Sequence, residues 1–264
     1  MGLFSGLAGV GDYTATIPIL ALPAELLRRW LPPELELAPQ TLTAPGTHPV
    51  LLLLGQERSV HVNIAPWFRI RYGEFATVMP FVQWRTPPTS YRGPYLWTPL
   101  LYLDRWLPIL AGRWLYGFAK AKAVITSSAD SYRVTDAETR RVLLDAQTGP
   151  SGAAPNPAEF ATLATLLQQP SLSQRDGAFI CSTFDWNLPQ AELSTSSADV
   201  QINQFYMYGL PNGAVENYHV SGLSDLTNGG AFHIRTTWTL SAPEPCTTFG
   251  QEGLGIRQEG LGVG

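Results

Sequence analysis

The sequence predicts a mainly β fold of the α+β class, a single domain in which antiparallel strands form a barrel or packed sheets with a few short helices. Segments rich in β-branched and aromatic residues recur along the chain, separated by turn-forming Pro, Gly, Asn and Asp. Hydrophobic residues make up 45% of the 264 residues and charged residues only 14%, so much of the chain must be buried. Helical periodicity is limited to three short segments. Many strands and few helices favour a barrel or two packed sheets.

The expected strands are residues 13–20, 72–84, 95–103, 121–127, 140–146, 198–209 and 231–240. Pro80 and Pro99 lie inside two of them. Because proline has no N–H to donate to a sheet, we expect an edge position or a bulge at each. The four leucines at 51–54 are at most a buried strand, and they are too few to span a membrane.

Three helices are expected. The first covers residues 23–31, because its opening proline is favoured at a helix start. The second covers 106–116 and ends near Gly112 or Gly117. The third covers 156–169, where an N-cap asparagine and a first-turn proline precede an apolar stripe.

No linker divides the chain, so residues 1–246 are expected to form one domain. The last stretch, FGQEGLGIRQEGLGVG, repeats QEGLG and has little to bury. We therefore expect a flexible, Gly-rich tail over residues 247–264.

The charge pattern argues against several partners and locations. The formal net charge is −4 and the 17 basic residues are scattered, whereas nucleic-acid binding needs a concentrated basic face. The apolar start lacks the basic residues of a signal peptide, and no apolar run reaches the length of a membrane span. Cys181 and Cys246 have neither metal-ligand spacing nor an evident disulfide framework, so we expect free thiols in a reducing compartment and a cytoplasmic protein. A charge-poor, tryptophan-rich chain is also expected to form a homo-oligomer.

Common catalytic and cofactor motifs are absent from the sequence, including GxSxG, the P-loop, HExxH, CxxC and the dinucleotide fingerprint. The four histidines are isolated in the sequence. We therefore expect no metal and no cofactor.

One segment stands out, AGRWLYGFAKAKAVI at residues 111–125, because it places Lys120 and Lys122 in an otherwise aromatic and aliphatic run. In a strand these two lysines share one face with Val124, while small residues occupy the other. The pattern alone favours two lysines that face water, and the alternative is that one is a buried amine with a chemical task.

This segment resembles the signature of the acetoacetate decarboxylase family, which has Gly-Arg followed by Gly-Phe-Pro-Lys-Lys after a strand containing Tyr-Leu-Asp. The chain has YLD at 102–104 and GRWLYGFAK at 112–120. RYGEF at 71–75 falls where the family carries Tyr-x-Glu, and residues 12–37 resemble its first strand and helix. The resemblance is collinear over about residues 12–240.

The resemblance implies a cone-like, β-rich barrel and a lysine that condenses with a ketone to form a protonated imine. The imine accepts the electrons released when a neighbouring carbon–carbon bond breaks. Carried over residue by residue, Lys120 matches the imine-forming lysine and Glu74 the glutamate on a preceding strand. The amine must be neutral, and because Ala121 replaces the family's second lysine we expect burial, rather than a neighbouring cation, to lower the pKa of Lys120.

Four aromatic residues are expected to contact a substrate. Tyr72 and Trp84 share the expected strand face of Glu74, and Tyr116 and Phe118 precede the lysine. Arg113 is expected to be structural, because beside a glycine at a helix end it can cap free carbonyls or pair with an acid such as Asp104.

The sequence also departs from the family pattern. The family's arginine before the first strand falls near Gly11, so its usual partner for a substrate carboxylate is missing. The second acid expected on the preceding strand falls among residues 51–54, with Gln56 or Glu57 the nearest polar residues. The pocket is therefore expected to be more apolar than the family's.

Two hypotheses follow from these features. The first is a lysine-dependent lyase acting on a keto acid or ketone, by decarboxylation or related aldol or dehydration chemistry. The second is a non-catalytic barrel that binds an apolar small ligand and keeps Lys120 as part of its scaffold.

Overall fold

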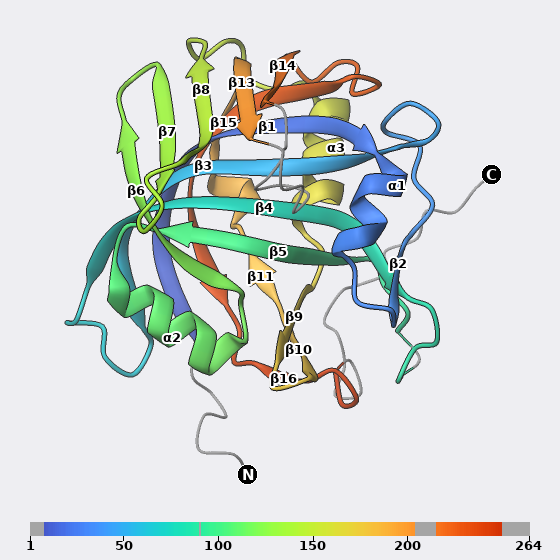
Figure 1. The fold of residues 1–264 in the computed structure, drawn as a ribbon, viewed down its shortest axis with the longest axis vertical. Helices are drawn as coiled ribbons and strands as arrows, with labels where there is room; N and C mark the ends of the chain where they lie inside the picture. Colours follow the sequence, from blue (N-terminus) through green and yellow to red (C-terminus); the bar gives the residue numbers. More distant parts are fainter. Residues whose placement is uncertain (1–7, 90, 204–214, 250–264) are drawn as a thin grey trace.

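The computed structural model describes residues 8–89, 91–203 and 215–249, and most of this part of the chain is β structure (Figure 1). The strands are β1 (Gly9–Pro23), β2 (Leu35–Leu37), β3 (Thr47–Val62), β4 (Ile70–Trp84), β5 (Tyr95–Leu103), β6 (Lys120–Ser127), β7 (Ser131–Asp136), β8 (Val142–Thr148), β9 (Ser171–Arg175), β10 (Ala178–Ser182), β11 (Phe184–Asp185), β12 (Glu192–Thr195), β13 (Ser197–Asn203), β14 (Val215–Ser221), β15 (Gly229–Leu240) and β16 (Glu244–Pro245). The helices are α1 (Ala24–Leu27), α2 (Trp106–Tyr116) and α3 (Pro157–Leu167), with 3₁₀ turns at Arg28–Trp30 and Leu188–Gln190. The predicted mainly β class is confirmed.

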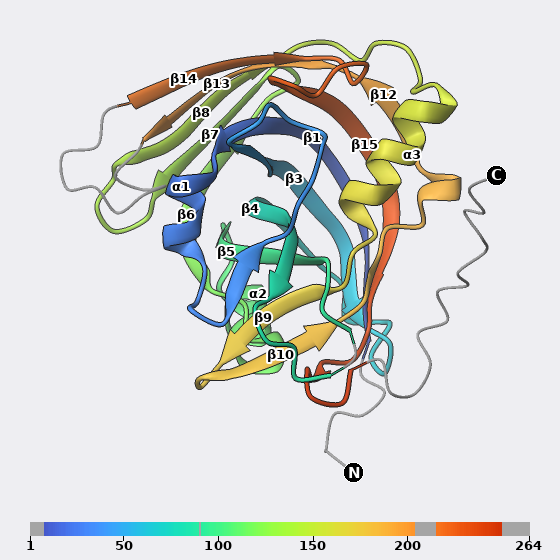
Figure 2. The ribbon, with the colours of Figure 1, turned by 90° about the vertical axis from the view of Figure 1, so that its right-hand side faces the viewer.

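The strands join into one large mixed sheet, whose main path runs β11-β15-β1-β3-β4-β5-β6-β7-β8-β13-β14. Most neighbours on this path are antiparallel, but β5 pairs in parallel with both β6 and β9. The sheet bends over, so that β7, β8, β13 and β14 form a layer above β1 and β3 (Figure 2). Within the described residues no ladder joins β14 to β11, so the expected antiparallel barrel is a curled, mixed sheet that stays open.

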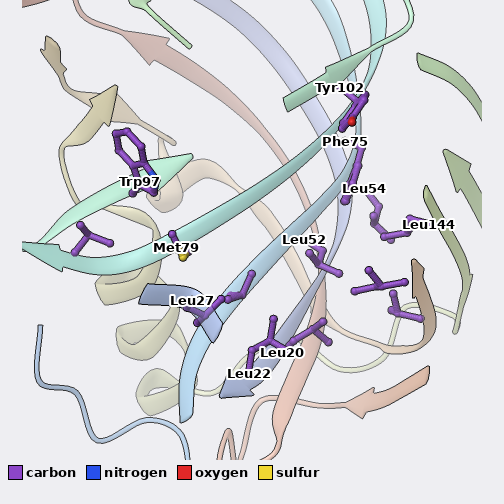
Figure 3. Packing of buried hydrophobic residues seen from close by; sticks show 14 of the residues in the cluster. Leu20, Leu22, Leu27, Leu52, Leu54, Phe75, Met79, Trp97, Tyr102 and Leu144 are labelled. Carbon is purple, nitrogen blue, oxygen red and sulfur yellow. The ribbon is translucent and has the colours of Figure 1, made fainter. Parts of the chain in front are cut away.

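The leucines at 51–54 show how the sheet separates two hydrophobic cores. Leu52 and Leu54 pack in the first core, on the side of the sheet drawn in Figure 3. Leu51 and Leu53 pack in the second core, on the opposite face. Because both faces of β3 are buried here, its sequence is continuously apolar and shows no alternation. The candidate site lies on the side of the second core.

The two prolines inside expected strands lie at irregularities, as predicted. The register of β4 against β5 shifts on both sides of Met79, next to Pro80. The following residue, Phe81, has a φ of 55°, which is uncommon for a residue other than glycine. On β5, the pairs with β4 go from Leu100 to Trp97 and skip Pro99. A bulge at each proline avoids the hydrogen bond that proline cannot donate.

This bulge corrects one expectation about β4. Tyr72 and Val78 pack in the second core on the side of Glu74, as expected. Val82 and Trp84, beyond the bulge, pack in the first core. The inserted residue changes which face the later side chains occupy, so Trp84 does not share a face with Glu74.

The expected strands are all present, with shifted ends, and residues 204–209 of the one expected at 198–209 lie outside the described residues. The strands that were not expected are β2, β7, β9, β10, β11, β12, β14 and β16, and the leucine run covered only part of β3. The expected helices are also present. Asn156 caps α3 by accepting hydrogen bonds from the N–H groups of Ala158 and Glu159. Helix α2 continues through Gly112 and ends at Gly117, which has a left-handed φ of 68°.

The expectation of two free thiols is wrong. Cys181 and Cys246 form a disulfide, with their Cα atoms 5.0 Å apart. The antiparallel pairing of β10 with β16 matches Cys181 with Glu244 and so brings Cys246 beside it. The argument for a reducing compartment therefore loses its basis. In the described residues, no helix is both long enough and apolar enough to cross a membrane.

Of the tail expected at 247–264, the structure describes only residues 247–249. Phe249 is buried, with its ring centroid 6.4 Å from that of Tyr95. Residues 250–264 lie outside the described part of the chain.

Candidate active site

Lys120 is the first residue of β6 and is held between a strand and a helix. Its backbone pairs in parallel with Leu101 of β5. Its side chain crosses the inner face of α2 at Gly112, where a β-carbon would lie 2.3 Å from Cε and 2.6 Å from Nζ of the lysine. Arg113 Nε donates a hydrogen bond of 2.7 Å to the carbonyl oxygen of Lys120. The GR pair of the sequence motif thus seats the lysine, with the glycine leaving room for the side chain and the arginine fixing the backbone.

The lysine opens into a cavity of about 100 Å³ on the side of the second core. Most of its lining is aliphatic or aromatic, and among the described residues Lys120 is the only cation that lines it. Its polar lining residues include two carboxylic acids, Glu57 and Glu74. The apolar lining residues are Leu51, Leu53, Ala76, Val78, Leu96, Leu101, Phe118, Leu167, Phe184, Trp186, Trp238 and Leu240.

Glu74 lies in the middle of the sheet, where β4 pairs with β3 and β5. The residue is only 8% exposed. Its backbone carbonyl accepts a hydrogen bond of 2.6 Å from the hydroxyl of Tyr132, which also donates to the carbonyl of Gly55 on β3. These contacts fix the backbone beneath the carboxyl group and leave the carboxyl group itself on the cavity side.

Glu57 supplies the second buried acid, from the neighbouring strand β3. It is 3% exposed, and its carboxyl oxygen accepts a hydrogen bond of 2.8 Å from Nε1 of Trp238. The register of β3 against β4 shifts just after it, and Ser59 has a φ of 53°. The strand is therefore regular up to Glu57, which keeps this side chain on the same side as Glu74.

Burial dominates the ionisation of all three groups. It raises the pKa of Glu57 well above its usual 4.5, with a further increase from the neighbouring Glu74 carboxylate. Burial also raises the pKa of Glu74, against the opposing effect of Lys120. Burial lowers the pKa of Lys120 below its usual 10.5, although both carboxylates oppose the change. Protonated carboxyl groups carry no charge, so they do not raise the pKa of Lys120. Neutral acids and a neutral amine are therefore mutually consistent here.

Lys122 has a different role from Lys120. Its Nζ donates a hydrogen bond to the carbonyl oxygen of Asp104, at the end of β5. It is not among the groups that perturb the pKa of Lys120. The direction of the shift and its cause therefore agree with the expectation that burial, rather than a neighbouring cation, lowers the pKa of Lys120.

No protein-family model matches the sequence, and no curated protein matches it, but several solved structures do. Acetoacetate decarboxylase from Legionella pneumophila has a TM-score of 0.58 and 14% identity, over 91% of this chain and 87% of that chain. An acetoacetate decarboxylase-like enzyme from Sphingomonas wittichii RW1 has a TM-score of 0.59 and 11% identity, over 91% of this chain and 93% of that chain. The enduracididine biosynthesis enzyme MppR, in complex with pyruvate, has a TM-score of 0.54 and 16% identity, over 93% of this chain and 92% of that chain.

The chain has an acetoacetate decarboxylase-like fold. The likeness covers nearly the whole length of this chain and of each matched chain. It confirms the fold that the resemblance of the signature segment implies.

Within this acetoacetate decarboxylase-like fold, four of the six residues expected in the site line the cavity, namely Lys120, Glu74, Tyr72 and Phe118. Tyr116 is not a lining residue but packs in the second core, with its ring stacked on that of Phe118 at a centroid distance of 6.0 Å. Trp84 is in the first core, against Phe179, and does not line the cavity.

Among the lining residues that were not predicted as site residues are Glu57, Trp186 and Trp238. Gln56 and Glu57 were the nearest polar residues to the leucine run, and the length of β3 could not be judged from that run. Trp186 and Trp238 come from the C-terminal part of the chain, where no motif marks them. Among the described residues, no group of three or more His, Cys, Asp or Glu side chains is placed to hold a metal ion.

Proposed function

We propose that the chain is a lysine-dependent lyase, in which Lys120 forms a Schiff base with a keto acid or ketone. The observation that carries this proposal is the isolation of Lys120 in an apolar cavity with two buried carboxyl groups, where no other described residue of the lining is a cation. A buried, neutral amine of this kind is a nucleophile at neutral pH.

In the proposed reaction, neutral Nζ of Lys120 attacks the carbonyl carbon of the substrate, and a carbinolamine forms. A neutral carboxyl group, Glu57 or Glu74, donates a proton to the carbinolamine hydroxyl, which leaves as water and gives a protonated imine. The bond to the substrate carboxylate then breaks, its electron pair moves to the imine nitrogen, and carbon dioxide and an enamine result. Protonation of the enamine carbon and addition of water release the ketone and restore the amine. Aldol or dehydration chemistry would proceed through the same imine and enamine.

The substrate is proposed to be more apolar than acetoacetate. Apart from Lys120, the polar lining of the cavity is Glu57, Glu74, Tyr72, Thr98 and Ser171. In the part of the chain that the structure describes, no arginine lines the cavity to pair with a substrate carboxylate, and a carboxylate in such surroundings is poorly solvated. Loss of carbon dioxide removes that charge, which favours decarboxylation as the default reaction. MppR, with a similar fold, has been crystallised with pyruvate, which supports a carbonyl compound as the ligand class.

The alternative function is a binding protein for an apolar small ligand. The mainly aliphatic and aromatic lining favours this alternative as well, and in that case Lys120 would be part of the scaffold.

The test is reductive trapping, and the chain suits it because Lys120 and Lys122 are its only lysines. The full chain and the Lys122→Arg and Lys120→Arg variants are incubated with pyruvate, acetoacetate, longer-chain β-keto acids and diketones, and then reduced with borohydride. An adduct in the full chain and in Lys122→Arg, but not in Lys120→Arg, supports the proposal. Absence of any adduct, with an unmodified apolar ligand recovered from the protein, would favour the binding protein.

We further propose that the protein is a homo-oligomer, because its charge content is low for its size. Sedimentation velocity at micromolar concentration measures the mass directly. A monomeric mass would contradict this proposal without affecting the one for Lys120.

A further inference from the structure

Helix α2 has an unusual outer surface. Its inner face, with Ile109 and Gly112, is buried against the site. Its exposed residues are Trp106, Leu107, Leu110, Arg113 and Trp114, so four of the five are large and apolar. Trp106, Leu110 and Trp114 are four residues apart and so form one stripe, and the two tryptophans are 59% and 62% exposed. A helix that faced only water would carry charged residues here.

The loop between β3 and β4 also exposes large apolar side chains, and it lies at the same end of the molecule as α2. Ile64, Trp67 and Phe68 are 65%, 80% and 57% exposed. Both views place this loop and α2 at the lower end of the molecule, away from the layer of β13 and β14 (Figures 1 and 2). We call these two groups together the tryptophan face, whose residues are Ile64, Trp67, Phe68, Trp106, Leu107, Leu110 and Trp114. They are seven of the eleven large apolar side chains that are exposed in the described residues.

The charges around this face have one sign. Residues 58–71 and 105–119 contain five arginines and no Asp or Glu, although acids outnumber bases in the whole chain by 21 to 17. The exposed arginines beside the face are Arg69, Arg71, Arg105 and Arg113, joined by Arg175, which donates to the last carbonyls of α2. None of these five pairs with a carboxylate in the described residues. Elsewhere on the surface, Arg28, Arg92, Arg133 and Arg235 do form such ion pairs.

Within the described residues, the nearest acids, Asp104 and Asp176, form no ion pair with these arginines. Asp104 precedes α2, but its carboxylate accepts a hydrogen bond of 3.0 Å from the N–H of Gly73. Asp176 follows Arg175 in the turn between β9 and β10. Arg105 occupies the N-cap position of α2, which has no side-chain cap and no acid in its first turn. A positive charge there is unfavourable for the helix on its own, and it becomes favourable when a negative charge lies outside it.

From this combination we infer that the tryptophan face docks on an anionic lipid surface. Tryptophan is favoured at the boundary between lipid and water, and arginines beside it attract anionic headgroups. A second copy of the chain is disfavoured as the occupant, because two such faces would bring unpaired arginines of the same sign together. The inference is independent of the reaction proposed for Lys120.

The test is flotation of the full chain with vesicles of phosphatidylcholine, alone and with phosphatidylglycerol. The native chain should float with the anionic vesicles, and added salt should release it. Trp106→Ser/Trp114→Ser should lower the partition coefficient by about tenfold or more, because the two buried tryptophans together contribute on the order of 1.4 kcal/mol or more. The matched control is Phe160→Ser/Val142→Ser, which removes exposed apolar side chains outside the face and should leave binding unchanged.

A second variant separates charge from apolar contact. Arg69→Glu/Arg105→Glu keeps the tryptophans and should abolish flotation with anionic vesicles. Thermal unfolding of every variant checks that it is folded. Three results would overturn the inference. The first is no flotation with either kind of vesicle, and the second is equal flotation with neutral and anionic vesicles that added salt does not change. The third is a native protein that binds no lipid but forms an oligomer, which Trp106→Ser/Trp114→Ser converts to monomers.

Discussion

The side chain of Lys120 lies directly against the backbone of Gly112, so closely that a β-carbon at residue 112 would be 2.3 Å from Cε of the lysine. This distance is far below a van der Waals contact, so no other residue type fits at position 112 while the lysine stays where it is. Glycine in the interior of a helix is otherwise unfavourable. Its presence in α2 is explained by the room that it leaves for the lysine.

Gly112→Ala should therefore displace Lys120 and impair imine formation. Helix propensity alone would make this change stabilising by up to about 1 kcal/mol, whereas overpacking costs about 1–3 kcal/mol. Borohydride trapping and thermal unfolding measure the two effects. The matched control is Ala111→Gly, which weakens the helix by about 1 kcal/mol without touching the lysine and should keep trapping intact. Normal trapping in a stabilised Gly112→Ala protein would rule out this role of the glycine.

Arg113→Ala should lower stability and leave imine formation in the folded protein. The guanidinium donates to the backbone carbonyl of Lys120 and is exposed to solvent, so the loss should be about 1 kcal/mol. Chemical denaturation measures the loss, and trapping at a temperature well below unfolding measures the chemistry. If trapping disappears while the unfolding midpoint is unchanged, the arginine belongs to the substrate and not to the scaffold.

Glu57→Gln should change how stability depends on pH. Because burial raises the pKa of Glu57 in the folded state, the folded protein binds its proton more tightly than the unfolded chain does. Its contribution is fully present below pH 4.5 and is lost as the pH rises through the folded pKa. The native protein should therefore lose stability relative to Glu57→Gln as the pH rises above 4.5. A glutamine can still accept the hydrogen bond from Trp238.

Glu36→Gln provides the opposite control. A hydrogen bond from Gln83, followed by the effects of Arg92, lowers the pKa of Glu36 below 4.5. The stability that this group contributes is present above pH 4.5 and is lost as the pH falls. The free energy of unfolding is measured by urea titration at pH values below and above 4.5. Relative to the native protein, Glu57→Gln should gain stability as the pH rises above 4.5, whereas Glu36→Gln should gain stability as the pH falls below it. If the difference in stability between Glu57→Gln and the native protein does not change with pH, the pKa of Glu57 is not raised on folding.

Loss of the Cys181–Cys246 disulfide should destabilise the fold. The bond closes a loop of 65 residues and joins β10 to β16, so its removal should cost about 2–4 kcal/mol. The midpoint temperature of thermal unfolding of the native protein should fall by several degrees when a reductant is added. The midpoint of Cys181→Ser/Cys246→Ser should not change with the reductant. Alkylation of two thiols in the native, unreduced protein would contradict the pairing.

The central residues of the candidate site could be predicted because they lie in one local motif. Lys120, Gly112 and Arg113 are close in sequence, and Glu74 follows from the strand whose tyrosine and glutamate match the family pattern. Glu57 could not be assigned, because β3 is buried on both faces and its continuous apolar run carries no alternation that fixes its direction or length.

Other features depend on pairing that only the fold creates. Trp84 was placed on the wrong face because the bulge at Pro80 reverses the alternation of β4 beyond it. The disulfide follows from the register of β10 against β16, two segments 65 residues apart at the cysteines. Strands β7 and β14 were missed because their alternation is mostly polar and weak.

The pKa of Lys120 tests the central claim most directly, namely that a buried, neutral amine faces the cavity. Protein labelled with ¹³C in lysine has only two lysine Cε signals, from Lys120 and Lys122, and Lys122→Ala assigns them. Titration of the Cε chemical shift gives each pKa without modifying the protein. Lys120 should titrate below 10.5 both in the native protein and in Lys122→Ala. A shift that vanishes in Lys122→Ala would make the neighbouring cation its cause, and a pKa of an ordinary exposed lysine in both proteins would contradict the claim.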